Sequence, residues 1–188
     1  TLTVTAVNDA PALASVDAVS FDEDGSGSTT LVGSDIDDDD DDLTYSIIDG
    51  TDITATLDGS TVSFTAPANF NGSESFTATV TDGEFTSSQA FTVTVNAVND
   101  APALAAVDAV SFGEDSSTSI TLSGSDIDGD GLTYSVSGGS DITATVDGFT
   151  VTFTASANFS GSEDFTATVT DGSLSGSQSF TVTATPVN

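Results

Sequence analysis

The residues of this chain that carry chemistry are acidic, and they recur in short clusters. Asp35-Ile36-Asp37 places two carboxylates two positions apart, and Asp126-Ile127-Asp128 repeats that spacing. Three further clusters also occur twice: a Phe-x-Glu-Asp segment around Glu23 or Glu114, an Asn-Asp pair at Asn8-Asp9 or Asn99-Asp100, and an Asp-Gly turn at Asp82 or Asp171. Calcium takes about six to eight oxygen ligands from carboxylates, carbonyls and water. These loops therefore predict calcium (Ca2+) sites wherever several of them converge.

The net charge of the chain also favours a bound cation. Its 188 residues include 30 Asp and Glu and no Lys, Arg or His, which gives a formal net charge of −30 at pH 7. The carboxylates therefore have no basic partner within the chain. This charge repels nucleic acid and acidic membrane surfaces, so we expect no nucleic-acid partner. No apolar run approaches the roughly 20 residues that cross a bilayer, so we expect no direct membrane insertion.

The composition argues against an enzyme. With no His, Cys, Lys or Arg, the available acid and base groups are carboxylates. They recur at the ends of the repeats, where metal binding explains them. A retaining glycosidase needs two carboxyl groups about 5 Å apart in a cleft, and nothing in the sequence marks a cleft. The absence of Cys also leaves bound metal as the candidate that stabilises such small domains.

Two copies of one domain account for the chain. Val98-Asn99-Asp100-Ala101-Pro102 repeats Val7-Asn8-Asp9-Ala10-Pro11. Residues 1–7 align with Thr92–Val98, the last predicted strand of the first copy, so we interpret them as the terminal strand of a preceding repeat. The predicted division is therefore 1–7 for that strand, 8–98 for repeat 1 and 99–188 for repeat 2. We expect the first segment to pack on a preceding repeat or on a neighbouring chain.

Apolar residues alternate with Thr along both copies, which is typical of half-buried strands. Seven short strands are predicted in the first copy: Ala14–Ser20, Thr29–Val32, Leu43–Ile47, Ile53–Leu57, Thr61–Thr65, Phe76–Val80 and Gln89–Val95. Asp-Gly and Asn-Gly dipeptides supply turns between them. The pattern predicts an all-β fold of two tandem seven-stranded antiparallel β-sandwiches of the Ig or cadherin-like Greek-key type. The predicted core aromatics are Phe21, Tyr45, Phe64, Phe70, Phe76 and Phe91, with their equivalents in the second copy.

The segment between the copies contains no Gly or Ser spacer, so we expect the sandwiches to stack end to end. This linker, Asn96-Ala97-Val98-Asn99-Asp100-Ala101-Pro102, is similar to the cadherin linker motif Asp-x-Asn-Asp-Asn-Ala-Pro, with Asn96 at the first acidic position and Ala101 at the last Asn. The Asp-x-Asp loops, Glu23, Glu114 and the Asp82 and Asp171 turns also match ligand motifs of that family. The family's Leu-Asp-Arg-Glu motif is absent, and Asn69 and Asn158 stand near its place.

Together these motifs resemble cadherins and, more closely, the cadherin-like tandem repeats of giant calcium-dependent bacterial surface adhesins of the RTX-adhesin type. The resemblance implies a secreted, extracellular or cell-surface protein whose repeats are bridged by calcium. It implies one junction site made of Glu23, Asn69, Asn99, Asp100, Asp126, Asp128 and Asp171. It implies a second, half site made of Asn8, Asp9, Asp35, Asp37 and Asp82, and a third that begins at Glu114 and Asn188.

A local calcium site is the alternative for one loop. Asp126-x-Asp128-x-Asp130-Gly131 matches the opening of an EF-hand loop, but position twelve is Ser137 rather than Glu, and predicted strands flank the loop. We interpret it as a sandwich loop that holds calcium through residues such as Asp130. The run Asp38–Asp42 has a simpler alternative, a solvated acidic loop.

The functional prediction is a calcium-rigidified extender or cell-adhesion element in a long adhesin or surface filament. Its partners would be adjacent repeats or neighbouring copies of the chain. One alternative is a carbohydrate-binding module for polysaccharide, for which Phe85 is the aromatic to check for exposure. Another is homophilic adhesion or lateral filament assembly.

Overall fold

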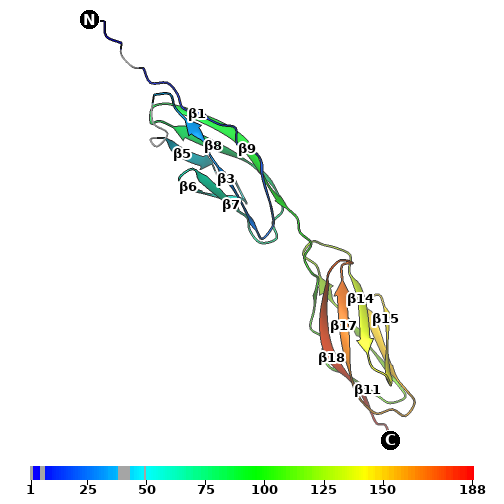
Figure 1. The fold of residues 1–188 in the computed structure, drawn as a ribbon. Coiled ribbons are helices and arrows are strands. Elements are labelled where there is room, and N and C mark those ends of the chain that lie inside the picture. The colour runs from blue at the N-terminus through cyan, green and yellow to red at the C-terminus, as the bar shows by residue number, and fades with distance from the viewer. Residues whose placement is uncertain (1, 5–6, 38–42, 49) are drawn as a thin grey trace. The chain divides into compact units, whose positions relative to one another are not determined.

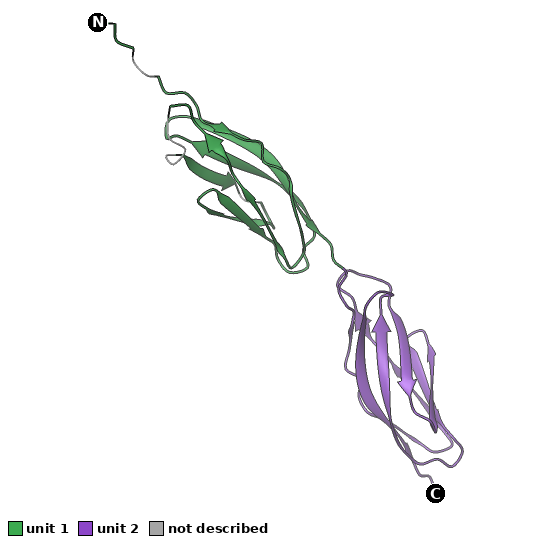
Figure 2. Ribbon diagram, viewed as in Figure 1, with its two compact units in different colours: residues 1–98 green, residues 99–188 purple. Residues whose placement is uncertain are grey.

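The computed structural model describes residues 2–4, 7–37, 43–48 and 50–188. The acidic run Asp38–Asp42 and part of the first predicted segment therefore lie outside the described residues. The chain divides into two compact units, Thr1–Val98 and Asn99–Asn188 (Figure 2). The described residues form strands, turns and loops, and no helix among them is long and apolar enough to cross a membrane.

Unit 1 is a sandwich of two main sheets (Figure 1). Its strands are β1 (Ala12–Leu13), β2 (Val19–Asp22), β3 (Ser26–Thr30), β4 (Gly33–Ser34), β5 (Thr44–Ile48), β6 (Thr54–Asp58), β7 (Thr61–Thr65), β8 (Gly72–Thr81) and β9 (Thr86–Asn96). One sheet has the order β2-β9-β8-β5 and the other β3-β7-β6, while β1 pairs with β4.

Unit 2 repeats this topology strand for strand. Its strands are β10 (Ala103–Leu104), β11 (Val110–Gly113), β12 (Ser117–Thr121), β13 (Gly124–Ser125), β14 (Thr133–Gly138), β15 (Ile142–Asp147), β16 (Thr150–Ala155), β17 (Gly161–Thr170) and β18 (Ser175–Thr185). The sheets are β11-β18-β17-β14 and β12-β16-β15, with β10 paired to β13.

The predicted fold class of two tandem all-β sandwiches is confirmed, with local differences. The predicted strand Thr29–Val32 overlaps only the end of β3, and residues 31–32 lie between β3 and β4. The predicted strand Ala14–Ser20 is wrong over most of its length, because β1 pairs with β4 whereas β2 pairs with β9. Residues 14–18 must leave one pairing and reach the other. In addition, β2 and β11 run parallel to β9 and β18, so the larger sheets are mixed rather than wholly antiparallel.

Alternating apolar residues of the two sheets form the core of each unit. In unit 1, Phe64 stands edge-on to Phe76 with ring centroids 5.2 Å apart, and Phe91 lies 5.9 Å from Phe64. Phe153, Phe165 and Phe180 form the same cluster in unit 2. The predicted core aromatics are all buried except Tyr45, Phe70, Tyr134 and Phe159, which are partly buried and pack against the core. Truncation of a fully buried Phe to Ala costs about 3 to 5 kcal/mol.

Candidate metal centres

In unit 2, the linker residues Asn99 and Asp100 are bound by loops from two distant parts of the sequence. The Asn99 side-chain amide donates a hydrogen bond to Asp171 Oδ2 over 2.9 Å. The backbone N–H of Asp100 donates to Asp128 Oδ2 over 2.8 Å. Asp128 follows β13 and Asp171 follows β17, so the sandwich brings the Asp-x-Asp loop and the Asp-Gly turn to the Asn-Asp pair.

Unit 1 has the same arrangement at the corresponding end. The Asn8 side-chain amide donates to Asp82 Oδ2 over 3.0 Å, and the Asp9 N–H donates to Asp37 Oδ2 over 2.7 Å. We call these two groups the acidic end clusters. The first contains Asn8, Asp9, Asp35, Asp37 and Asp82, and the second contains Asn99, Asp100, Asp126, Asp128 and Asp171.

The first Asp of each Asp-x-Asp loop has one satisfied and one unsatisfied oxygen. Asp126 Oδ1 accepts the N–H of Asp128 over 2.9 Å, and Asp35 Oδ1 accepts the N–H of Asp37 over the same distance. The Oδ2 atoms of Asp126 and Asp35 are buried and have no hydrogen-bond partner within the described part of the chain. A buried polar atom without a partner costs about 1 to 3 kcal/mol, and more when it is charged. A cation beside these oxygens would remove that cost.

The Asp-Gly turns keep their carboxylates ionised. The pKa of Asp171 is lowered chiefly by the hydrogen bond from the Asn99 side chain, and further by the N–H groups of Leu174 and Ser173. The pKa of Asp82 is lowered chiefly by the N–H of Phe85, with help from Glu84 and Asn8. Both side chains are therefore anionic at neutral pH, which is the form that binds a metal ion.

The opposite end of each unit carries the predicted glutamates. Glu23 is 7% exposed, and its Oε1 atom accepts the backbone N–H of Val98. Glu114 Oε1 accepts the N–H of Val187 over 2.9 Å in the same way. The N–H of Asn69 donates to Asp24 Oδ1 over 3.2 Å, which places Asn69 beside the residue that follows Glu23. Glu23 and Asn69 belong to unit 1, so their predicted union with the end cluster of unit 2 stays a prediction.

The donor chemistry of the end clusters fits calcium, although the ligands are not fully assembled. Carboxylate, amide and backbone oxygens suit a hard cation such as calcium better than zinc or copper. Among the described residues, no three acidic side chains converge closely enough to form a ready metal-ligand group. A calcium ion at an end cluster would therefore require the loops to move their carboxylates inward.

The Asp126–Gly131 loop is not an EF-hand. It lies between the strands β13 and β14, whereas an EF-hand loop lies between helices. Gly129 has a positive φ of 80°, while Gly131, which occupies the place of the EF-hand glycine, is not among the positive-φ glycines. Asp130 is exposed, and its N–H lies 3.4 Å from Asp126 Oδ1. The sequence-based interpretation as a sandwich loop is consistent with this geometry.

Sequence reasoning missed one exposed aromatic residue. Phe85, the aromatic singled out for exposure, is 41% exposed, but Phe149 is 59% exposed. The position of Phe149 in the sequence could have indicated its exposure, because residues next to a hairpin turn commonly face solvent. Phe149 follows an Asp-Gly turn at the place where the first repeat has Ser60.

Comparison with known proteins identifies the family of the duplicated sandwich. The model of the bacterial Ig domain family matches residues 8–96 and again residues 99–185. This chain belongs to the bacterial Ig domain family. No curated protein sequence matches it.

The solved structures similar to these two bacterial Ig domains include cadherin domains. The EC1-4 structure of PcdhgB3 aligns with a TM-score of 0.60 at 16% identity, covering 98% of this chain and 52% of that one. Protocadherin Gamma B2 extracellular cadherin domains 1-5 align with a TM-score of 0.54 at 17% identity, covering 97% and 41%. The chain thus spans about half or less of the length of these proteins. At this level of identity the likeness establishes a shared Ig or cadherin-like fold.

Proposed function

We propose that these bacterial Ig domains are calcium-rigidified structural repeats of a long extracellular adhesin or surface filament of the RTX-adhesin type. Bacterial Ig domains and cadherin-like folds are typically extracellular or at the cell surface, which agrees with this role. The observation that carries the proposal is the buried Oδ2 atom of Asp126, which has no hydrogen-bond partner among the described residues, and the same finding at Asp35. Both atoms lie in loops that also bind the preceding Asn-Asp pair.

The linker is the element on which calcium would act. On the unit 1 side, Glu23 accepts the N–H of Val98. On the unit 2 side, the side chains of Asp171 and Asp128 accept hydrogen bonds from Asn99 and Asp100. Each unit therefore binds the part of the linker nearest to it through carboxylates. A divalent cation would neutralise these groups and supply direct bonds to their oxygens.

The residues proposed to hold calcium are those of the end clusters, together with the glutamate end of a preceding repeat. Asp126, Asp128, Asp171, Asn99 and Asp100 would contribute from unit 2, and the corresponding residues of unit 1 would do the same there. Glu23 and Asn69, and Glu114 in the second repeat, would complete the coordination between adjacent repeats. In this proposal the partners are adjacent repeats and neighbouring copies of the chain.

The expected stabilisation is large for domains of this size. Extracellular calcium sites have dissociation constants of about 10⁻⁴ to 10⁻³ M. Free calcium at about ten times the dissociation constant stabilises the folded state by about 1.4 kcal/mol per site. Several such sites approach the net stability of a small domain. Without calcium, the like charges of the clusters repel, so the linker should become more mobile.

The test is thermal unfolding combined with small-angle X-ray scattering on the chain stripped of divalent cations and titrated with calcium or magnesium. We expect calcium to raise the melting temperature and to narrow the distribution of maximum dimensions, with a much weaker effect of magnesium. The variant D126N/D128N should lose most of the response of unit 2.

The matched control is D58N, which removes a carboxylate from an exposed hairpin outside the clusters. It should respond to calcium like the unsubstituted chain. If neither stability nor scattering changes up to about 10 mM calcium, well above the expected dissociation constants, the proposal is wrong.

A further inference from the structure

Phe149 is an aromatic side chain that the fold does not require. It lies in the hairpin between β15 and β16, directly after Gly148, whose φ is +59°, and it is 59% exposed. Its backbone oxygen accepts the N–H of Leu122 over 2.8 Å. In the first repeat, the backbone oxygen of Ser60 accepts the N–H of Leu31 over the same distance. The backbone therefore supplies the structural contact in both repeats, and the ring is an addition of the second.

The ring borders a hollow at one open side of the sandwich. The hollow has a volume of about 330 Å³ and is lined by Leu132, Thr133, Tyr134, Val146, Gly148 and Phe149. Its walls come from β14 and β15 and the turns beside them. Each of these strands is the edge strand of its sheet, since β14 pairs with β17 and β15 with β16. Edge strands present backbone N–H and C=O groups that no neighbouring strand takes up.

The hollow is rigid on its inner side. The hydroxyl of Tyr134 accepts the N–H of Gly124 over 2.9 Å, which fixes the tyrosine ring. Leu132, Val146 and Tyr134 also pack against the core of unit 2. A ligand would therefore meet a preformed apolar floor, one exposed ring and a polar border, which is the usual composition of a small-molecule site.

The first repeat provides a natural comparison. Its equivalent positions are Leu43, Thr44, Tyr45, Leu57, Gly59 and Ser60, so the floor is nearly the same and the exposed ring is missing. Tyr45 is also fixed by a hydrogen bond from Gly33 N–H, 2.8 Å long. The aromatic side chain is therefore the principal difference between these two sets of positions.

The chemistry of the lining selects the class of ligand. No lining residue is charged, and the net charge of −30 repels anions. A neutral saccharide fits because the C–H face of a pyranose ring stacks on an aromatic ring, while its hydroxyls bind polar groups around it. Thr133 and the outward-facing backbone groups of the two edge strands would supply such groups. We propose that the Phe149 hollow of the second repeat is a binding site for neutral saccharides, independent of calcium.

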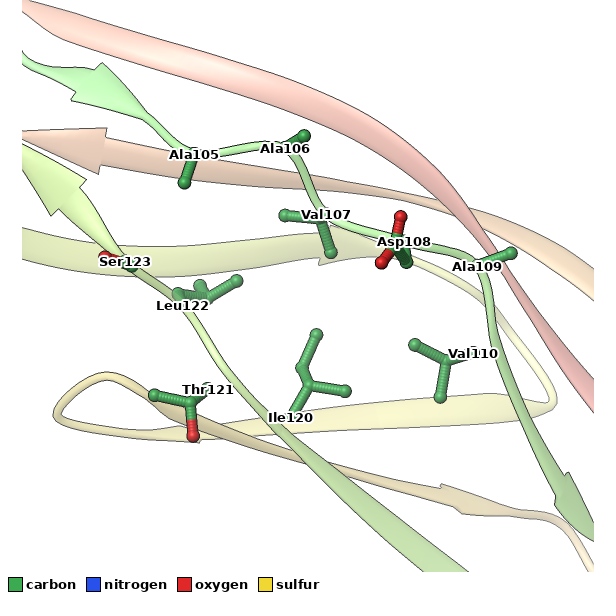
Figure 3. A pocket seen from close by; sticks show the side chains of 10 residues that line it. All are labelled: Ala105, Ala106, Val107, Asp108, Ala109, Val110, Ile120, Thr121, Leu122 and Ser123. Carbon is green, nitrogen blue, oxygen red and sulfur yellow. The ribbon is translucent and has the colours of Figure 1, made fainter.

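A second hollow in unit 2 has several aliphatic side chains and no aromatic ring in its lining. It has a volume of about 320 Å³ and lies between residues 105–110 and 120–123. Figure 3 shows Val107, Val110 and Ile120 extending into the space between these two segments. A ligand recognised only through apolar contact would favour this hollow. The first repeat has Thr29 in place of Ile120, so I120T is a substitution that the fold already accommodates.

The experiment is affinity electrophoresis of the whole chain in native gels that contain mixed-linkage β-glucan, galactomannan or arabinoxylan, run in EDTA and again in calcium. We expect at least one of these polysaccharides to retard the chain under both conditions. F149S should weaken the retardation about tenfold or more, the order expected for the loss of one stacked ring. S60F should add a second site, and I120T should bind like the unsubstituted chain.

Several outcomes would overturn the proposal. They are no retardation by any of the three polysaccharides, equal retardation of F149S, or loss of binding in I120T. Abolition of binding by about 0.15 M NaCl would indicate a charged contaminant or a charge-driven contact instead. Retardation that occurs only in calcium would place binding at the end clusters. Thermal unfolding of F149S should match that of the unsubstituted chain, so that loss of binding is not loss of folding. Because the gels with EDTA report on the hollow alone, failure here and failure of the calcium proposal are distinguishable.

Discussion

At the scale of single residues, two glutamates outside the end clusters each stabilise a loop of their own unit by accepting backbone hydrogen bonds. Glu163 on β17 accepts the N–H groups of Ser140, Asp141 and Ile142, the last over 2.7 Å, and also the Ser140 hydroxyl. Glu74 on β8 accepts the N–H groups of Thr51, Asp52 and Ile53. In a chain without basic residues, backbone N–H groups thus take the place of a salt-bridge partner.

These hydrogen bonds predict a specific loss of stability in acid. The Ser140 hydroxyl and the neighbouring N–H groups lower the pKa of Glu163 from its ordinary value of 4.5 to about 2. Because the pKa is lower in the folded state, the contribution is complete above about pH 4.5 and is lost as the pH falls toward 2. We expect E163Q to lower the melting temperature by several degrees at pH 7, and the difference from the unsubstituted chain to vanish near pH 2.

Calorimetric scans from pH 7 to pH 2 would measure this effect. E74Q should behave alike in the first repeat, where the N–H of Asp52 is the main cause of the lowered pKa of Glu74. An E163Q deficit that stays constant across this range would show that Glu163 acts through packing and not through its charge.

Two tyrosine hydroxyls offer a second test at the residue scale. Tyr45 and Tyr134 accept the N–H groups of Gly33 and Gly124. Y45F and Y134F keep the ring and remove the acceptor, so each should lower the free energy of unfolding by about 1 to 3 kcal/mol. The loss should be larger for Y45F, because Gly33 is buried whereas Gly124 is half-buried. Urea unfolding measures both values, and a neutral Y45F would mean that water replaces the lost acceptor.

At the scale of elements, the turn before each long hairpin depends on an asparagine. Asn69 and Asn158 have φ angles of 57° and 56°, and their N–H groups donate to Asp24 and Asp115. A left-handed conformation costs L-residues about 1 to 2 kcal/mol, although Asn tolerates it better than most and Gly adopts it freely. We expect N158V to lower the free energy of unfolding by about that amount or more and N158G to be nearly neutral. Equal losses in the two variants, measured by urea unfolding, would show that the side chain and not the backbone angle matters.

The strands and turns that were predicted correctly are those whose sequence signals lie within a few residues of one another. Period-two patterns predicted β8 and β17, and Asp-Gly dipeptides predicted hairpins such as the one at Gly59, because both signals lie within a few residues. The predicted strand Ala14–Ser20 was wrong because the positions of β1 and β2 on either side of residues 14–18 depend on pairing with β4 and β9, which are distant in the sequence. The exposure of Phe149 was missed, although its place directly after the Asp147-Gly148 turn was a local signal for it.

The candidate site was predictable to a similar degree. The Asn-Asp pair, the Asp-x-Asp loop and the Asp-Gly turn were predicted to meet, and hydrogen bonds join them in each unit. The residue types could not predict which carboxylate oxygens accept hydrogen bonds and which do not. Asp128 and Asp171 accept hydrogen bonds from the linker, while one oxygen of Asp126 is buried and has no hydrogen-bond partner in the part of the chain that the structure describes.

At the scale of the whole molecule, uncompensated charge is the main destabilising feature. A chain with a net charge of −30 and no basic residue repels itself whenever it is compact. Ions in solution reduce that repulsion, because the screening length falls from about 30 Å at 0.01 M to about 8 Å at 0.15 M salt. We therefore expect the melting temperature of the calcium-free chain to rise steadily with NaCl over this range.

Calcium should weaken that dependence on salt. Each bound ion removes two negative charges from the cluster where repulsion is strongest, so less repulsion remains for NaCl to screen. Calorimetry over the same NaCl series, with EDTA or with saturating calcium, would measure the two slopes. D126N/D128N in calcium should retain a steeper slope than D58N in calcium, because the double variant loses the ion and D58N loses only one exposed charge. Identical slopes with and without calcium would mean that the end clusters bind no ion, and the acidic surface would then act only to keep the chains apart.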